Sequence, residues 1–71
     1  MSGTQIRNQI RRLRFEHSEM TQQALADRIG VTRQTVNAIE QGKYSPSLEA
    51  AFRIARVFGV PLEQVFHYHP D

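Results

Sequence analysis

The stretch from Thr21 to Gly42 contains two start signals for short helices, with a glycine between them. Thr21 and Thr32 belong to the residue types whose side-chain oxygen accepts a backbone hydrogen bond at a helix N-terminus. An apolar residue precedes each threonine and another follows four residues after it, which is the spacing of the hydrophobic staple. Gly30 lies where a helix ends in a left-handed residue that glycine adopts at little cost. The two predicted helices span about residues 22–29 and 33–41.

Two helices joined by a glycine turn form the outline of a helix-turn-helix. The outward face of the second helix carries Arg33, Gln34 and Asn37 and has no carboxylate. In the major groove of DNA, arginine pairs with guanine, and glutamine or asparagine pairs with adenine. An ordinary solvated helix more often mixes in Glu and Lys, so the pattern favours DNA reading over that alternative.

Length and charge limit the alternatives. A chain of 71 residues predicts one domain over residues 1–71, with loose ends at about residues 1–4 and 68–71. Residues 1–14 hold four arginines and no acid, and these either attract phosphates or are simply solvated. No apolar run approaches the roughly 20 residues needed to cross a membrane. No signal peptide or cysteine is present either, so a cytoplasmic location is expected.

Apolar periodicity predicts three more helices and no strand of consequence. The first spans about residues 4–17, with Ile6, Ile10 and Leu13 as its buried stripe. The fourth spans about residues 47–58, and its predicted inward side chains are Leu48, Ala51, Ile54, Ala55 and Phe58. The fifth is short, begins near Pro61 and carries Leu62, Val65 and Phe66, after which the tail from His67 is expected to be loose. The predicted fold class is therefore all-α.

The stretch from Thr21 to Lys43 resembles the Cro/repressor-type (XRE-type) helix-turn-helix family of transcriptional regulators, and the likeness covers roughly residues 5–67. Its most specific part is Gly-Val-Thr-Arg-Gln-Thr-Val at residues 30–36. The resemblance implies a five-helix bundle of the phage repressor DNA-binding domain type. It also implies that the partner is double-stranded DNA and that the second helix of the motif enters the major groove.

The resemblance further implies roles for individual residues. Base-reading positions on the second helix are Arg33, Gln34, Asn37 and Ala38. Positions implied to contact the DNA backbone are Gln22, Thr32, Gln41, Lys43 and Tyr44. For Lys43 the alternative is a cation that compensates the C-terminus of the second helix.

Glu40 lies at the edge of the buried face of the second helix, and Arg14 lies at the edge of the apolar stripe of the first helix. A partly buried carboxylate is poorly solvated, so a guanidinium partner is expected. In many members of the family a glutamate at this position pairs with an arginine of the first helix. We therefore predict a structural ion pair between Arg14 and Glu40.

Two departures from the family pattern leave questions open. The link from Arg14 to Thr21 is one residue longer than in the phage repressors, so the placement of residues 15–19 is not predicted. Ala24 stands where many relatives have a glutamate that completes a capping box.

A homodimer is expected, because one recognition helix reads too few base pairs for useful specificity. The candidate dimer interface is Val65, Phe66 and Tyr68. No enzyme is predicted, since the seven acids are scattered and no nucleophile has a matching base. His67 and His69, even with Asp71 and His17, lack a convincing ligand set, so no metal, cofactor or small-molecule ligand is expected.

The leading hypothesis is a sequence-specific transcriptional regulator, with repression as the expected mode. The alternative is an antitoxin-type protein-interaction module that binds DNA secondarily. A third hypothesis, an architectural protein indifferent to sequence, is disfavoured because Arg33, Gln34 and Asn37 offer groups that distinguish bases.

Overall fold

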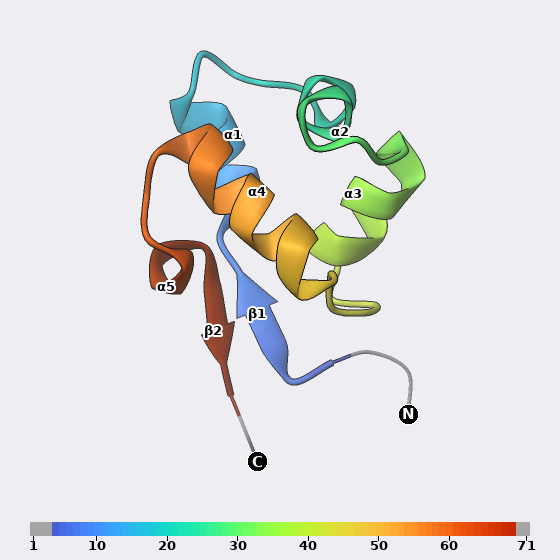
Figure 1. Ribbon diagram of the computed structural model, residues 1–71, viewed down its shortest axis with the longest axis vertical. Coiled ribbons are helices and arrows are strands. Elements are labelled where there is room, and N and C mark those ends of the chain that lie inside the picture. Colours follow the sequence, from blue (N-terminus) through green and yellow to red (C-terminus); the bar gives the residue numbers. More distant parts are fainter. Residues whose placement is uncertain (1–3, 70–71) are drawn as a thin grey trace.

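A computed structural model describes residues 4–69, and within that range it contains five helices and one two-stranded sheet (Figure 1). The elements in chain order are β1 (Ile6–Asn8), α1 (Ile10–Glu16), α2 (Gln22–Ile29), α3 (Arg33–Glu40), α4 (Leu48–Phe58), α5 (Leu62–Val65) and β2 (Phe66–Tyr68). The sheet lies at the opposite end of the molecule from α2 (Figure 1).

The helix-turn-helix forms as its local signals predict. The Thr21 side chain accepts a hydrogen bond from the Ala24 backbone N–H at 3.0 Å, and the Thr32 side chain accepts one from the Thr35 N–H at 3.2 Å. Gly30 ends α2 with a φ of 78°, a left-handed conformation that favours glycine. The predicted bounds of α2 are confirmed, and α3 ends one residue earlier than predicted.

The prediction of a first helix over residues 4–17 is wrong in its first part. Ile6 lies in β1, which pairs antiparallel with β2 so that Ile6 faces Tyr68 and Asn8 faces Phe66. Helix α1 starts only at Ile10, where the Asn8 side-chain oxygen accepts a hydrogen bond from the Ile10 N–H at 3.1 Å. A strand partner about 60 residues away thus determines the backbone of residues 6–8.

The all-α fold class and the loose tail are corrected by the same pairing. Phe66, predicted at the end of the fifth helix, begins β2 instead. The His69 N–H donates to the Gln5 carbonyl oxygen at 2.9 Å, and the Thr4 N–H donates to the Gly42 carbonyl oxygen at 3.2 Å. The fold is mainly helical with a small sheet, and residues 1–3 and 70–71 of the predicted loose ends lie outside the described residues.

All five helices contribute to one apolar core. Its largest fully buried side chains are Ile10, Leu25, Ile29, Val36, Ile54 and Val65. Helix α4 runs across this core between the Ser47 cap, whose hydroxyl accepts from the Ala50 N–H at 3.1 Å, and Gly59. Four of the five inward residues predicted for α4 are buried, but Leu48 is 70% exposed, because the first turn of α4 extends beyond the core.

Within residues 4–69 no helix combines the length and the apolar character needed to cross a membrane.

Candidate nucleic-acid interface

Helix α3 has one buried and one open face, as its sequence predicts. Val36 and Ile39 are buried in the core, whereas Arg33 and Gln34 are exposed near the N-terminus of the helix. Asn37 and Ala38 are half-buried one turn further along. The four predicted base-reading residues therefore lie on the part of α3 that the core leaves open.

A polar network links the start of α2 with the end of α3. Gln22 Nε2 donates to Asn37 Oδ1 at 3.2 Å and to Glu40 Oε1 at 3.2 Å. Gln41 Nε2 donates to the same Asn37 Oδ1 at 3.3 Å. Residues predicted separately as base readers, backbone contacts and ion-pair partners thus form one hydrogen-bonded cluster.

The predicted pair of Arg14 and Glu40 is present at the base of this network. Arg14 Nε donates to Glu40 Oε2 at 2.6 Å and Nη2 donates to Oε1 at 3.1 Å. The third nitrogen of the guanidinium, Nη1, donates to the Met20 carbonyl oxygen at 2.8 Å. One arginine therefore holds α1, the entry to α2 and the end of α3 together, which fixes the angle at which α3 faces outward.

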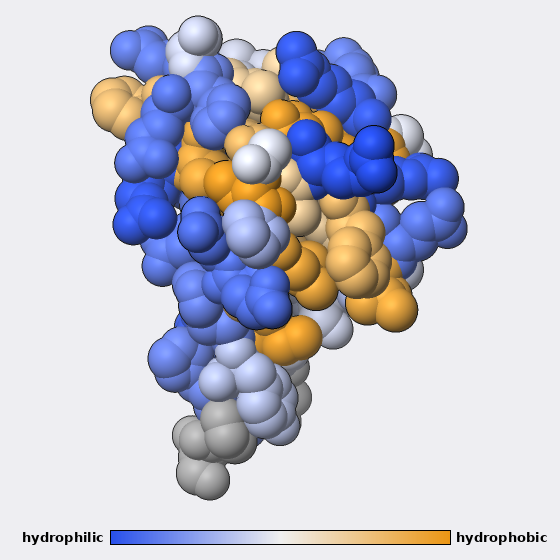
Figure 2. Space-filling view, turned by 60° about the vertical axis from the view of Figure 1, so that its left-hand side comes forward, coloured by the Kyte–Doolittle hydropathy of each residue, from blue (hydrophilic) through white to orange (hydrophobic). Residues whose placement is uncertain are grey.

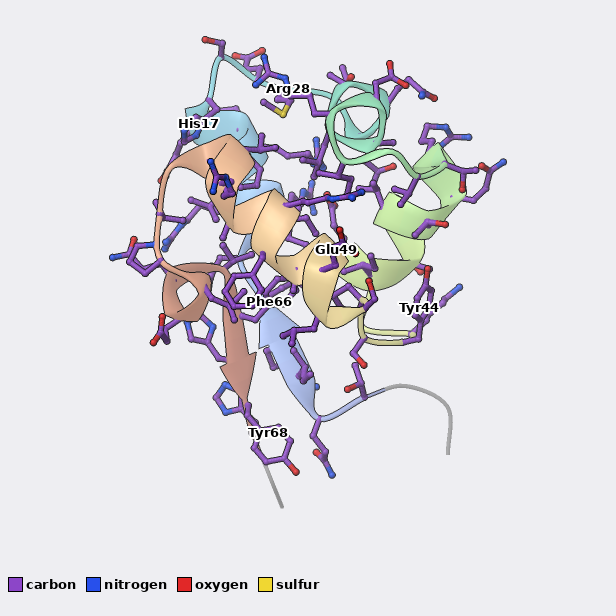
Figure 3. All side chains as sticks on the ribbon, in the orientation of Figure 1. His17, Arg28, Tyr44, Glu49, Phe66 and Tyr68 are labelled. Carbon is purple, nitrogen blue, oxygen red and sulfur yellow. The ribbon has the colours of Figure 1, made fainter. Side chains whose placement is uncertain are left out.

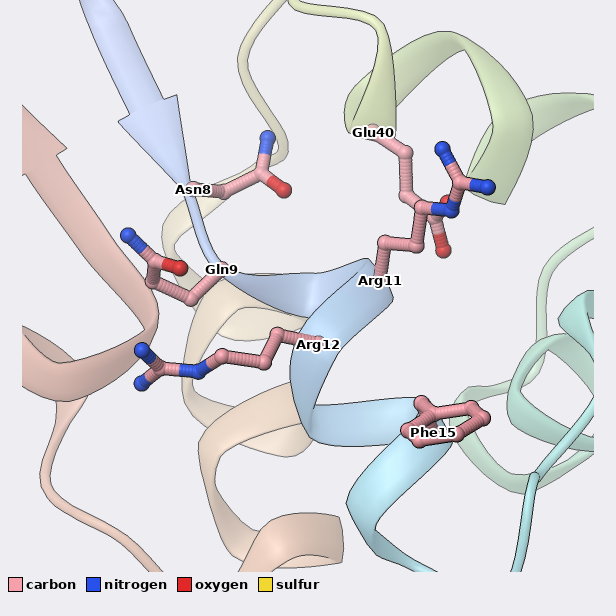
Figure 4. Close-up of a pocket in the computed structure, with 6 residues that line it drawn as sticks. All are labelled: Asn8, Gln9, Arg11, Arg12, Phe15 and Glu40. Carbon is pink, nitrogen blue, oxygen red and sulfur yellow. The ribbon is translucent and has the colours of Figure 1, made fainter.

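A polar hollow of about 390 Å³ opens above the network. Its lining residues are Arg11, Arg14, Gln22, Asn37, Glu40 and Gln41. Arg11 is exposed on α1, and its side chain extends toward Glu40 of α3 (Figure 4). Sequence reasoning placed Arg11 only in a general arginine cluster, because its position beside α3 depends on how α1 packs.

The cations on and around α3 outnumber the unpaired carboxylates. Glu40 is neutralised by Arg14, while Arg11, Arg33 and Lys43 make no ion pair with any residue between 4 and 69. Elsewhere Arg12 pairs with Glu16 at 3.7 Å and Arg53 pairs with Glu49 at 2.9 Å, while Arg28 and Arg56 also make no ion pair with residues 4–69. Unpaired cations on one face raise the local concentration of a polyanion such as DNA.

The loop after α3 satisfies the carbonyl groups at the helix end. The Gly42 N–H donates to the Ile39 carbonyl oxygen and the Lys43 N–H donates to the Ala38 carbonyl oxygen, both at 3.0 Å. This turn leaves the side chains of Lys43 and Tyr44 exposed, and Tyr44 lies at the outer edge of the molecule beside α3 (Figure 3). Both predicted backbone contacts are therefore accessible, whereas Thr32 uses its hydroxyl to cap α3.

Asn8 is a structural residue that sequence reasoning did not identify. Its Nδ2 donates to the Ile39 carbonyl oxygen at 2.9 Å while its Oδ1 accepts from the Ile10 N–H. The side chain thereby attaches the end of β1 to the end of α3. No sequence signal distinguishes this asparagine, because its partner on α3 lies 31 residues away.

The predicted dimer interface requires a correction. Val65 is 0% exposed and belongs to the core, so it offers no surface to a second molecule. Phe66 is half-buried, and Tyr68 is 68% exposed at the far end of the sheet (Figure 3). Of the three residues, Phe66 and Tyr68 alone are accessible.

An apolar groove of about 250 Å³ lies beside Phe66. The residues that line it are Ile6, Pro46, Leu48, Ala51, Leu62 and Phe66. Phe52, one helical turn after Leu48, is 50% exposed. Apolar side chains are exposed among polar ones on the side of the molecule seen in Figure 2.

The two histidines of the C-terminal strand region have ring centres 6.5 Å apart. Residues 4–69 contain no group of three or more His, Cys, Asp or Glu side chains arranged to hold a metal ion, and Asp71 lies outside that range.

Comparison with known proteins identifies the family. A family model described as Helix-turn-helix matches residues 10–65. An uncharacterized HTH-type transcriptional regulator of Methanocaldococcus jannaschii is 48% identical over 66 residues, which are 93% of this chain and 98% of that relative. The cryptic phage CTXphi transcriptional repressor RstR from Vibrio cholerae is 38% identical over 82% of this chain and 51% of its own length.

The fold has solved counterparts as well. The crystal structure of the P22 c2 repressor protein in complex with a synthetic operator superimposes with a TM-score of 0.66 at 18% identity, covering 76% of this chain and 85% of the repressor chain. At that identity the likeness concerns the fold alone. The match over residues 10–65 and the relatives show that this chain belongs to the Cro/repressor-type (XRE-type) helix-turn-helix family of DNA-binding transcriptional regulators.

Proposed function

We propose that this protein is a sequence-specific repressor that binds double-stranded DNA as a homodimer, with α3 in the major groove. The observation that carries the proposal is the open face of α3, where guanidinium and amide groups stand beside unpaired cations and no unpaired carboxylate. One similar protein supports the repressor role, since a relative that is 38% identical is named a phage transcriptional repressor.

In this proposal Arg33, Gln34, Asn37 and Ala38 meet the edges of the bases. Arg33 and Gln34 lie at the N-terminal end of α3, which is the end that contacts bases in helix-turn-helix complexes. Their exposure leaves both side chains free to extend into the groove. Ala38 is small enough to approach a thymine methyl group, a contact that carries sequence information.

The backbone contacts surround these residues. Gln22 is the first residue of α2, where the unpaired N–H groups of a helix N-terminus favour a phosphate. Thr32, Gln41, Lys43 and Tyr44 flank α3 at its two ends. The structure adds a candidate, Arg11, whose position in the polar hollow suits a phosphate that passes beside α1.

The homodimer would form through the apolar groove and its rim rather than through Val65. Leu48 and Phe52 on α4, with Phe66 and Tyr68 on β2, are accessible apolar or aromatic residues outside the proposed DNA surface. Large exposed apolar side chains that gather around a groove mark an interaction surface more often than scattered ones do. A two-fold dimer would present two α3 helices to half-sites centred about 34–36 Å apart.

Selection of bound sequences from random duplex DNA tests the proposal. The expected result is one enriched site with two-fold symmetry, and sedimentation of the complex should show two chains per site. Retention of all duplexes with equal affinity would contradict sequence-specific binding. A single chain on an asymmetric site would contradict the homodimer while leaving DNA reading intact.

The same groove is the observation that favours the second candidate, an antitoxin-type module that covers another protein. The two functions make different demands on the free chain. A module of this kind needs a partner protein to cover the groove, whereas the repressor covers it with a second copy. A free chain that sediments as a monomer at tens of micromolar would favour the module.

A further inference from the structure

We infer that Glu40, acting through Gln22, fixes the hydrogen-bond polarity of Asn37, so that Asn37 presents only N–H donors to DNA. Asn37 then reads a base acceptor, namely purine N7, guanine O6 or thymine O4, and does not form the two-bond pair with adenine. This inference rests on the proposed function and specifies what one of its reading residues can recognise.

The argument begins at Glu40, whose carboxylate accepts both Arg14 Nε at 2.6 Å and Arg14 Nη2 at 3.1 Å. A carboxylate in such a pair accepts hydrogen bonds and donates none. The Glu40 side chain is only 8% exposed, so water does not replace the partners it has. Any polar group that faces it must therefore offer a donor.

Gln22 is the group that faces it. The side-chain amide of Gln22 lies 3.2 Å from Glu40 Oε1, so the amide must turn its NH₂ and not its carbonyl oxygen toward the carboxylate. The same nitrogen lies 3.2 Å from the Asn37 amide and has a second hydrogen to donate. A donor can be received there only by Asn37 Oδ1, because an opposed NH₂ group would leave two donors facing each other.

Asn37 Oδ1 receives a second donor on its other side. Gln41 Nε2 lies 3.3 Å from it, so the two lone pairs of the carbonyl oxygen both have partners. Asn37 Nδ2 makes no hydrogen bond to any side chain or backbone group between residues 4 and 69. The amide thus retains two donors and has no lone pair left for a ligand.

This polarity decides which base edge fits. The pair of asparagine with adenine needs one donor and one acceptor on the same amide, because adenine presents N7 as acceptor and its N6 amino group as donor. With Oδ1 occupied, Asn37 can serve only acceptors. Gln34 differs, since its amide makes no hydrogen bond among residues 4–69 and keeps both functions.

Base analogues in the selected operator test the inference. Each analogue lacks one group in the major groove. Three remove an acceptor: 7-deazapurines lack N7, 2-aminopurine lacks guanine O6 and 5-methylpyrimidin-2-one lacks thymine O4. Two remove a donor: unsubstituted purine lacks the adenine amino group and pyrimidin-2-one lacks the cytosine amino group. Affinity is measured for the wild type, for Asn37→Ala and for the matched control Gln34→Ala. A contact belongs to Asn37 when its deletion weakens the wild type and has no further effect on Asn37→Ala.

The expected result is that one acceptor deletion weakens the wild type by about 2- to 12-fold, the range for one hydrogen bond, and leaves Asn37→Ala unaffected. Deletion of an adenine or cytosine amino group should change the affinity of the wild type and of Asn37→Ala by the same factor. Dependence of an adenine or cytosine amino group on Asn37 would overturn the inference, and so would the absence of any base that depends on it. Contacts that depend on Gln34 should persist in Asn37→Ala.

The role of Glu40 is tested with Gln22→Met, which breaks the link to Asn37 and leaves the Arg14–Glu40 pair in place. Gln41 is exposed and can turn its own amide over together with that of Asn37, so an amino group should newly depend on Asn37. An unchanged analogue pattern in Gln22→Met would show that Glu40 does not set the polarity. If random duplex DNA yields no preferred site for the wild type, the proposed function itself fails, which is a distinct outcome from a site whose adenine amino group depends on Asn37.

Discussion

The guanidinium of Arg14 and the carboxylate of Glu40 form a two-bond ion pair across 26 residues of sequence, with their side chains 15% and 8% exposed. The same guanidinium also holds the Met20 carbonyl oxygen. Loss of the arginine would leave the largely buried Glu40 carboxylate without a charged partner, with Gln22 as its remaining donor, and the Met20 carbonyl oxygen without its donor. The pair therefore connects the stability of the fold with the orientation of α3.

We expect Arg14→Ala to lower the free energy of unfolding by up to about 3 kcal/mol, because it removes one partner of a largely buried ion pair. Urea denaturation measures the loss. The matched control is Arg12→Ala, because Arg12 and Glu16 are 62% and 55% exposed and such pairs contribute less than about 1 kcal/mol. Equal losses in the two variants would contradict the structural role of Arg14. The double change Arg14→Met with Glu40→Leu should recover much of the loss, because it leaves no unpaired charge.

The turn between α1 and α2 contains two non-glycine residues in the left-handed region, Ser18 with a φ of 58° and Glu19 with a φ of 54°. This conformation costs an ordinary residue roughly 1–2 kcal/mol, so Ser18→Gly should stabilise the protein by up to about 1 kcal/mol after the greater freedom of glycine in the unfolded chain is counted. Thermal unfolding measures the change. Ser45→Gly, an exposed loop position without positive φ, should instead be destabilising. A loss of stability in both variants would show that Ser18 is not strained.

The homodimer proposal predicts that charges on the apolar face separate the two copies. Leu48→Glu and Phe52→Glu should each raise the dimer dissociation constant about tenfold or more, because anchor residues of an interface contribute on the order of 1–2 kcal/mol. Sedimentation equilibrium checks this. Both side chains are at least half exposed, so the monomer should keep its unfolding free energy to within about 0.5 kcal/mol. The matched control is Phe15→Glu, which changes a phenylalanine that is 68% exposed on α1. Loss of the dimer in the control as well would remove the assignment of this face.

Base discrimination by Arg33 predicts a selective defect. Arg33→Ala should cost about 1–3 kcal/mol on the selected site and much less on duplexes altered at one base pair per half-site, because the bidentate contact to guanine is lost. Binding measured on the selected site and on its three single-base-pair variants at that position separates the possibilities. A uniform loss on all four duplexes would make Arg33 a phosphate contact.

The proposed phosphate contact of Arg11 predicts a loss of affinity that does not depend on the base sequence. Arg11→Gln should weaken all duplexes to the same extent and reduce the slope of log affinity against log salt by about 0.9, the contribution of one neutralised phosphate. Arg56→Gln is the matched control, because Arg56 is also exposed but lies on α4, outside the polar hollow. A salt slope that changes equally in both variants would show that general charge, and not the position of Arg11, is responsible.

Local interactions explain why the helix-turn-helix could be predicted from the sequence. The caps of Thr21, Thr32 and Ser47 involve a backbone N–H only three residues away, and Gly30 needs nothing beyond its own backbone freedom. The family resemblance then gave the partner of Glu40. The sequence alone thus determined the two motif helices, the open face of α3 and the Arg14–Glu40 pair.

The tertiary structure decided what depends on distant partners. Ile6 fits the helical spacing of Ile10 and Leu13 equally well, and only its pairing with Tyr68 places it in a strand. Helical periodicity likewise groups Leu48 with Ala51 and Ala55 on one face of α4. It does not show that the core ends before Leu48, which leaves that side chain 70% exposed. The hydrogen-bond polarity of Asn37 comes from donors on α2 and at the end of α3, which the chain brings together only when α1, α2 and α3 pack around Arg14. Non-local contacts of this kind have no local sequence signal, because each residue type remains compatible with several neighbours until the fold selects one.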